Sequence, residues 1–296
     1  MTDSKASVRA YALLAGAQLA VGAAAIFARW ALTGAGPLSV SALRLTIAAA
    51  AVWALAAMRR KATHVSPEFR TRLAIAGVAL AAHFGTWIAS LQYTTVAIST
   101  LLVSTTPLWT AMYDAVVRKR PMRARVWPAY ALAGLGLLMV VGIGGSAPPI
   151  PGHALLGAAL AIAGSISIGA YFEIVRSMRA DVSTRDVVQQ TYGWAAIVLI
   201  VAAVVARQAP PPLEDGTAWA GIVAMALVSQ LLGHTAMNAS LRRFSPTAVA
   251  MTTLLEPVVA ALLALAIFGE RLLPLALLGG VVLLAAVAAV LREEAR

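Results

Sequence analysis

Cysteine is absent from the 296 residues of the chain, and charged residues make up only 12% of them. Without a thiol, the chain has no disulfide framework, no thiolate metal site and no redox dithiol. Soluble domains carry about 25% charged and about 45–50% apolar residues, whereas 60% of this chain is hydrophobic. Too few polar side chains remain to cover a soluble surface, so most of the chain must face lipid or other helices.

The chain also lacks the motifs that carry common enzyme chemistry. It contains no His-Glu-x-x-His pair and no glycine loop followed by a lysine that could hold a nucleotide phosphate. No carboxylate stands at ligand spacing from its four histidines, which are His64, His83, His153 and His234. We therefore expect no enzymatic activity, no cofactor and no metal. A membrane-embedded enzyme acting on lipid is the least favoured alternative.

Ten apolar segments are long enough to cross a bilayer, whose core requires about 20 mostly apolar residues per helix. In the first half, 1–147, the predicted helices cover residues 10–30, 38–58, 73–92, 95–117 and 126–144. In the second half, 148–296, they cover residues 153–175, 187–206, 217–241, 244–268 and 272–291. The sequence therefore predicts an all-α integral membrane protein with ten transmembrane helices.

Basic residues gather in the loops on one side of these predicted helices. If the N-terminus is inside, 19 of the 23 lysines and arginines lie in inner segments, and outer segments contain Arg207 and Arg271 alone. Inner loops of membrane proteins are enriched in Lys and Arg. We therefore predict a multi-pass protein of the cell inner membrane with both termini cytoplasmic. The same clustering accounts for the net charge of +11 without any binding of nucleic acid.

The second half repeats features of the first at an offset of about 150 residues. Ala89-Ser90-Leu91 recurs as Ala239-Ser240-Leu241, and Pro107 recurs as Pro257. Because each half has an odd number of helices, the second copy must enter the membrane from the opposite face. Inverted repeats are characteristic of transporters. We therefore predict two inverted five-helix repeats that move a small-molecule substrate across the lipid bilayer by alternating access.

Several motifs carry a resemblance to a known family. The stretches LLEPVVAA at 254–261 and FGERL at 268–272, with Gly279-Gly280, resemble the ninth and tenth helices of the drug/metabolite transporter superfamily (EamA-type). Pro37 followed by Ala42-Leu43-Arg44 resembles its second helix. Within the superfamily, the chain is most similar to YddG-type exporters of aromatic and other amino acids. The resemblance implies an exporter of aromatic or neutral amino acids, or of related small metabolites.

Polar and aromatic side chains within the spans indicate where a substrate could bind. In the third and eighth predicted helices such side chains recur at i, i+4 and i+7 or i+8, and so share one face. The candidate substrate-binding residues are His83, Trp87, Ser90, Trp109, Tyr171, Gln230, His234 and Asn238. The functional interpretation is a central cavity for a zwitterion with an apolar side chain. The alternatives are hydrogen bonds between helices and, for Trp109, an aromatic belt at the membrane surface.

Pro107 and Pro257 occupy matching places in the fourth and ninth predicted helices. Proline has no amide hydrogen, so each residue removes one hydrogen bond of its helix and frees a carbonyl group. Broken helices near a repeat axis commonly form the binding site or its hinge. We predict that both prolines are hinge residues, and a tolerated kink is the alternative.

Two arginine positions bear on the mechanism. Arg44 lies about 10 Å along its predicted helix from Pro37, at 1.5 Å per residue. It either binds a substrate carboxylate, extends outward along the helix or bonds a loop carbonyl. In the first half, Arg120-Pro121 stands where many members of the superfamily carry a glutamate, as Glu270 does in the second half. A role for a symmetrical pair of acidic residues is therefore in doubt.

Glu256 is the candidate residue for proton coupling, because it is a carboxylate within a span. A structural hydrogen bond to the backbone group freed by Pro257 is the alternative role. Asp114 and Glu173 lie near the inner ends of their helices, where we expect both to be solvated. A single deep carboxylate favours facilitated diffusion or exchange. The alternative function, a proton-coupled exporter of cationic drugs, would require Glu256 to face the cavity.

Glycines 134, 136, 142, 144 and 145, in and just after the fifth predicted helix, predict close packing against a neighbouring helix. That neighbour is either the tenth helix of the same chain or a second copy in a homodimer. The sequence leaves this choice open, and it does not identify the substrate.

Overall fold

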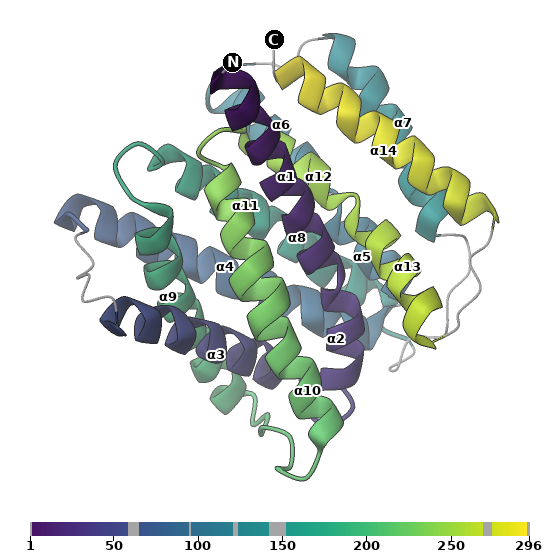
Figure 1. Cartoon of the computed structure of the whole chain (residues 1–296). Coiled ribbons are helices and arrows are strands. Elements are labelled where there is room, and N and C mark those ends of the chain that lie inside the picture. Colours follow the sequence, from purple (N-terminus) through teal and green to yellow (C-terminus); the bar gives the residue numbers. More distant parts are fainter. Residues whose placement is uncertain are drawn as a thin grey trace.

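The computed structural model describes residues 2–58, 65–94, 96–120, 124–141, 152–268 and 274–294, and all regular structure within these ranges is helical. The first half contains α1 (Thr2–Gly22), α2 (Ala24–Ala31), α3 (Pro37–Met58), α4 (Pro67–Tyr93), α5 (Val96–Val103), α6 (Thr106–Val116), the short η1 (Ala124–Val126) and α7 (Trp127–Val141). The second half contains α8 (Ala154–Ser177), α9 (Thr184–Val205), α10 (Gly216–Ala224), η2 (Met225–His234), α11 (Thr235–Ser240), α12 (Pro246–Thr253), α13 (Glu256–Phe268) and α14 (Pro274–Glu294). The two ends of the chain lie on the same side of the bundle (Figure 1).

Polar caps and prolines fix where several helices begin. Ser183, Asp215 and Ser245 precede α9, α10 and α12, and each side chain accepts a hydrogen bond from the amide three residues later. Such caps satisfy amide groups that the first turn leaves unpaired. Pro37 and Pro274 are the first residues of α3 and α14, a position where the missing amide hydrogen costs nothing. The loops thus determine the start of the apolar helices that follow them.

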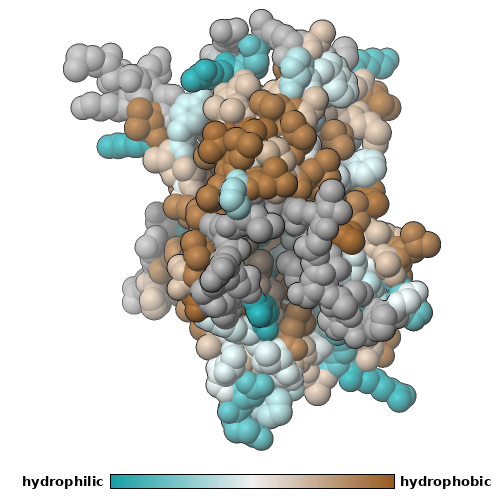
Figure 2. Space-filling view, turned by 90° about the vertical axis from the view of Figure 1, so that its right-hand side faces the viewer, coloured by the Kyte–Doolittle hydropathy of each residue, from teal (hydrophilic) through white to brown (hydrophobic). Residues whose placement is uncertain are grey.

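Seven helical stretches in the described ranges are long and apolar enough to cross a membrane, and α7 contains a shorter apolar stretch, Trp127–Met139. The seven are Val8–Ala31, Pro37–Met58, Pro67–Tyr93, Ala154–Ser177, Thr184–Val205, Gly216–Ser240 and Pro246–Ile267. Large apolar side chains on their outer faces are exposed, as at Ile197, Val201 and Val205 of α9. Figure 2 shows apolar surface over the upper part and the flanks of one side of the molecule and hydrophilic surface near its two ends. These features indicate a multi-pass membrane protein.

The other three predicted spans correspond to α5 with α6, to η1 with α7, and to α14. That all ten segments cross a bilayer stays a prediction. Residues 95, 142–144 and 272–273 of the predicted spans, and the predicted boundary between the halves at 147 and 148, lie outside the described residues.

Helix packing follows the same pattern when the two halves are exchanged. α4 of the first half packs against α8 of the second half. The equivalent contact, with the halves exchanged, joins η2 and α11 of the second half to α1 of the first. α4 also contacts α9, as η2 contacts α3. The remaining contacts pair equivalent helices with each other: α3 with α9, α6 with α12, and α7 with α14. This pattern is the one expected of two repeats related by a pseudo-two-fold axis.

The fifth and tenth predicted helices pack against each other. α7 and α14, the fifth and last helices of the two halves, lie side by side and antiparallel (Figure 1). Gly136 makes the close approach possible, because a Cβ there would lie 2.9 Å from the carbonyl oxygen of Gly279. The neighbour of the glycine-containing α7 is therefore α14 of the same chain. The structure contains one copy of the chain and does not test a homodimer.

Two predicted helices are broken immediately before a proline. The fourth is divided at Ser104 and Thr105, so that α6 begins beside Pro107. The ninth is divided at Leu254 and Leu255, two residues before Pro257. Pro107 cannot donate to the carbonyl oxygen of Val103, four residues earlier. The hydroxyl of Thr106 donates to that oxygen instead, over 2.9 Å.

Candidate functional site

A cavity lies at the centre of the bundle, between helices of both halves. The polar and aromatic side chains that line it include Arg44, His83, Phe84, Trp87, His234 and Glu256. The volume of the cavity that is accessible to the centre of a water molecule is about 40 Å³. One water molecule needs about 10–15 Å³ by that measure, so the cavity has room for a few water molecules. A larger solute would require the two halves to move apart.

The two histidines from equivalent helices meet at this cavity. The ring centroids of His83 on α4 and His234 on η2 are 6.5 Å apart. His83 stacks on Trp87, with centroids 6.0 Å apart and an interplanar angle of 7°. Nδ1 of His83 lies 2.9 Å from the carbonyl oxygen of Gly164. Because a carbonyl only accepts, Nδ1 carries the hydrogen, and Nε2 of a neutral ring is left as an acceptor.

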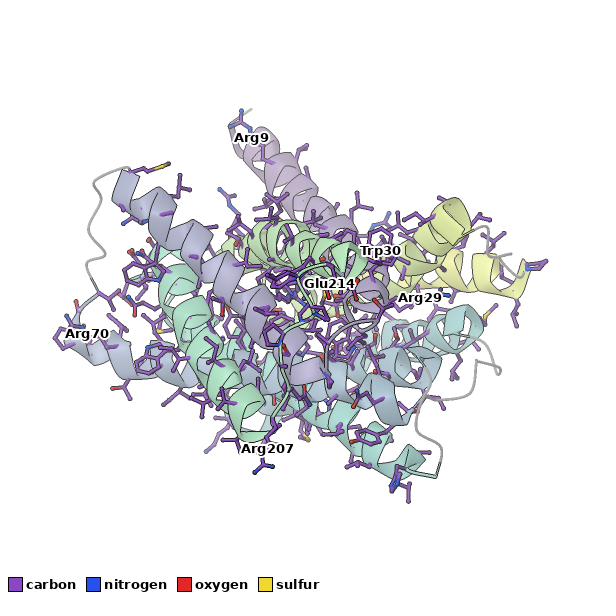
Figure 3. The ribbon with its side chains drawn as sticks, turned by 90° about the horizontal axis from the view of Figure 1, so that it is seen from below. Arg9, Arg29, Trp30, Arg70, Arg207 and Glu214 are labelled. Atoms are coloured by element: carbon purple, nitrogen blue, oxygen red, sulfur yellow. The ribbon has the colours of Figure 1, made fainter. Side chains whose placement is uncertain are left out.

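Arg44 is fully buried at the wall of the cavity. Its Nε donates to Oε1 of Gln230 over 3.1 Å, and its guanidinium carbon lies 3.9 Å from the centroid of the Phe84 ring. This contact with the ring face is a cation–π interaction. In Figure 3, by contrast, Arg9 and Arg207 project outward from the bundle. Arg44 therefore does not extend to the surface, which was one of the roles left open by the sequence.

Buried atoms around the cavity have no hydrogen-bond partner among the described residues. They are Nη1 and Nη2 of Arg44, Nε1 of Trp87 and Nδ1 of His234. Glu256 lines the same cavity and interacts electrostatically with Arg44. Buried polar groups in folded proteins are nearly always paired with protein, water or ligand. Water or a solute therefore completes this site.

Three of the eight predicted binding residues line the cavity: His83, Trp87 and His234. Glu256, the candidate for proton coupling, lines it as well. The other five lie outside its lining, and they are Ser90, Trp109, Tyr171, Gln230 and Asn238. Direct contact of these five with a substrate stays a prediction.

These five side chains form hydrogen bonds to neighbouring groups. Gln230 accepts from Arg44 and so holds the guanidinium in place. Tyr171 donates to Oδ1 of Asn238 over 2.8 Å, which joins α8 to α11. The hydroxyl of Ser90 lies 2.6 Å from that of Ser99 on α5, and Nε1 of Trp109 donates to Thr105. All are contacts that hold helix turns or neighbouring helices together.

Both helix breaks border the cavity. Val103 and Thr253 stand four residues before Pro107 and Pro257, at equivalent places in the two halves, and both line the cavity. A movement of α6 or α13 at its break would therefore change the shape of the cavity directly. The hinge role of the two prolines stays a prediction.

Sequence reasoning missed several features of the site. Phe84 lines the cavity, but a phenylalanine in an apolar span gives no signal that separates a cavity wall from a lipid-facing surface. Met225–His234 forms a π-helical stretch, where a regular helix was predicted. π-Helical turns are frequent at functional sites, and this one carries Gln230 and His234.

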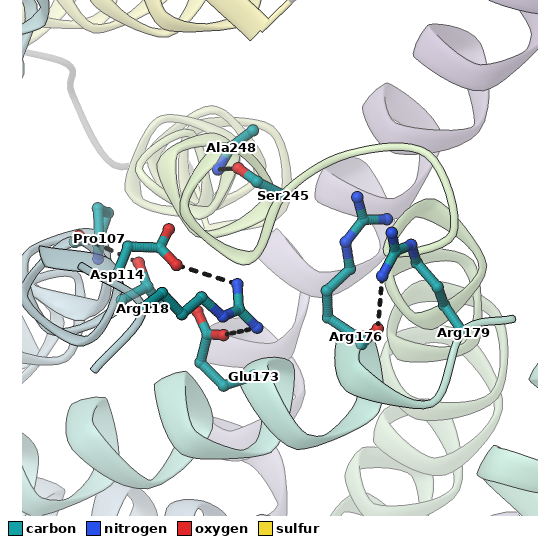
Figure 4. Close-up of polar contacts among 9 residues, drawn as sticks. Pro107, Asp114, Arg118, Glu173, Arg176, Arg179, Ser245 and Ala248 are labelled. Carbon is teal, nitrogen blue, oxygen red and sulfur yellow. Dashed lines mark hydrogen bonds and ion pairs between the residues drawn. The ribbon is translucent and has the colours of Figure 1, made fainter. Parts of the chain in front are cut away.

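A cluster of charged residues joins the two halves beyond the cavity. Arg118, just after α6, contacts Asp114 at 3.0 Å and Glu173 of α8 at 2.7 Å (Figure 4). The expectation that Glu173 is solvated is wrong, because its side chain is only 5% exposed beneath Arg118. Arg176, one turn further along α8, donates to the carbonyl oxygen of Leu241. These contacts tie α8 to α6 and α11 at one end of the bundle.

An apolar outer surface around a small cavity that contains polar and aromatic side chains, shared by two packed halves, is the arrangement of a membrane transporter. The model of the EamA-like transporter family matches residues 8–142 and 155–292, once in each half. The chain therefore belongs to this family and contains two of its repeats. A crystal structure of a protein superimposes with a TM-score of 0.79, covers 98% of each chain and is 16% identical, which shows a shared fold. Comparison with curated proteins gave no match.

Proposed function

We propose that the protein is an inner-membrane transporter that exports aromatic or neutral amino acids, or related small metabolites, by alternating access. Its ten helices would cross the membrane as two inverted repeats, with both termini in the cytoplasm. One observation carries the proposal: polar and aromatic side chains of both halves converge on one buried cavity that borders both broken helices. The resemblance to YddG-type exporters supports the substrate class.

The position of the cavity supports alternating access. It lies between the repeats, so a relative rotation of the halves opens one end as it closes the other. The contact of Arg118 with Glu173 holds α6 of the first half to α8 of the second. Opening of that end requires this ion pair to separate. Transport as facilitated diffusion or exchange needs no further energy source.

A second candidate is a proton-coupled exporter of cationic drugs. Glu256 favours it, because this carboxylate lines the cavity and could bind either a cationic solute or a proton. Glu256→Gln separates the two candidates in vesicles. A drug antiporter should lose transport driven by a pH gradient, whereas a facilitator should keep flux driven by a substrate gradient.

The function is tested with purified protein in liposomes loaded with radiolabelled amino acids and assayed for efflux. Trp87→Ala and His234→Ala should lower the efflux by at least about tenfold, because each removes a group that the bound solute contacts. Trp127→Ala is the matched control, since Trp127 is exposed at the start of α7. Unchanged efflux in the Trp87 and His234 variants would show that the cavity is not the binding site.

A further inference from the structure

We propose that Arg44 binds a carboxylate group of the transported solute through Nη1 and Nη2, so that transport requires a carboxylate. This inference rests on the proposed transport function and narrows its substrate class. Of the three roles that the sequence left open for Arg44, the proposal selects the binding of a substrate carboxylate.

The guanidinium of Arg44 is fixed before any solute arrives. Gln230 holds Nε, and the Phe84 ring covers one face of the group. Nη1 and Nη2 are buried and have no hydrogen-bond partner among the described residues. A planar guanidinium held in this way is preorganised for the two parallel hydrogen bonds that a carboxylate accepts.

Glu256 does not occupy these positions. It lines the cavity and interacts electrostatically with Arg44, but its carboxylate forms no hydrogen bond with Nη1 or Nη2. Water can satisfy the donors in an empty cavity, yet neutral water does not compensate the charge of a buried guanidinium. The open side of Arg44 therefore favours an anionic group.

Trp87 also favours a ligand that carries acceptor oxygens. Nε1 of Trp87, a group that can only donate, is also buried and without a partner in the described part of the chain. The unpaired donors of Arg44 and Trp87 can each pair with an acceptor oxygen of a ligand. Phe84, Trp87 and Phe172 provide apolar walls for the remainder of the solute.

The test compares three versions of the same solute in proteoliposomes. Protein-dependent efflux, after subtraction of the leak from protein-free liposomes, is measured for radiolabelled phenylalanine and leucine and compared with that of their carboxamides and of the amines that lack the carboxyl group. For the unmodified protein, the amino acids should exceed both analogues by at least about tenfold, because a charge-assisted pair of hydrogen bonds is lost. This comparison needs no variant and does not depend on how a substitution folds.

Two substitutions then assign the preference to Arg44. Arg44→Gln should abolish the preference for the amino acid, and Arg44→Lys should reduce it, because lysine keeps the charge but lacks the planar pair of donors. Arg207→Gln, in an exposed loop, should behave as the unmodified protein. Each variant is first checked for a monodisperse elution profile in detergent.

The outcomes distinguish the two levels of the proposal. Amines or carboxamides that leave as fast as the amino acids would overturn the role of Arg44 and keep the transport function. An Arg44→Lys variant that keeps the full preference would also overturn it. No efflux of any of these compounds from the unmodified protein would contradict the proposed function itself.

Discussion

Replacing Gly136 with alanine tests how closely the two halves pack where α7 meets α14. A Cβ at this position would lie 2.9 Å from the carbonyl oxygen of Gly279 and 3.0 Å from the backbone nitrogen of Leu283. Cβ atoms essentially never come nearer than 3.0 Å to another heavy atom. The contacted atoms belong to the backbone of α14, so they cannot rotate away and the helices must separate. Overpacking of this kind costs about 1–3 kcal/mol.

A second glycine on the same helix provides a matched control. Gly134 is exposed, and an added Cβ there meets nothing within 4 Å. Gly134→Ala should therefore be neutral or stabilising by up to about 1 kcal/mol, because alanine favours the helix. Melting of the purified protein in detergent, followed by tryptophan fluorescence, should give Gly136→Ala a Tm several degrees lower than Gly134→Ala. Equal Tm values for the two variants would refute the close α7–α14 contact.

Three further predictions concern a helix break, the ion pair between the halves and the carboxylate in the cavity. Pro107→Ala should slow efflux by about tenfold or more while the protein remains folded, because it allows the helix to continue through the break; Pro128→Ala, in the exposed first turn of α7, should leave efflux unchanged. Glu173→Gln should weaken the contact with Arg118 by about 1–3 kcal/mol, seen as a lower Tm, and an unaltered Tm would show that the pair does not hold the halves together. Glu256→Gln should leave efflux down an amino-acid gradient within about threefold of the unmodified rate; loss of pH-driven flux alone would favour the drug exporter.

Part of the site could be predicted from the sequence because charge and polarity stand out in apolar spans. His83, Trp87, His234 and Glu256 were found in this way, and all four line the cavity. The apolar part of the lining could not be predicted, because lipid and protein interior select the same side chains. Phe84 is an example of such an apolar lining residue. It follows His83 in the chain and does not belong to the polar face predicted for that helix, yet it lines the same cavity.

Long-range pairs were also beyond sequence reasoning. Gln230, which holds Arg44, stands 186 residues away from it in the chain, and a single sequence does not show which of many polar residues will meet. The same limit applies to Glu173, whose partner Arg118 lies in a different half. Helix positions, by contrast, depend on local hydrophobicity and on caps, so the sequence could predict the seven apolar helical stretches that are long enough to cross a membrane. Pro107 and Pro257 also indicated which two helices are broken.

In the proposed mechanism, buried side chains of both halves form a cavity that opens to each side of the membrane in turn. Because the chain has no cysteine, one introduced thiol can be followed without background. Ser104 lines the cavity, whereas Ser90 is buried outside it. Ser104→Cys should react with a membrane-impermeant maleimide added to either side, more slowly when transported amino acid is present, and Ser90→Cys should not react. Access to Ser104→Cys from one side only, or labelling that substrate does not slow, would contradict the account.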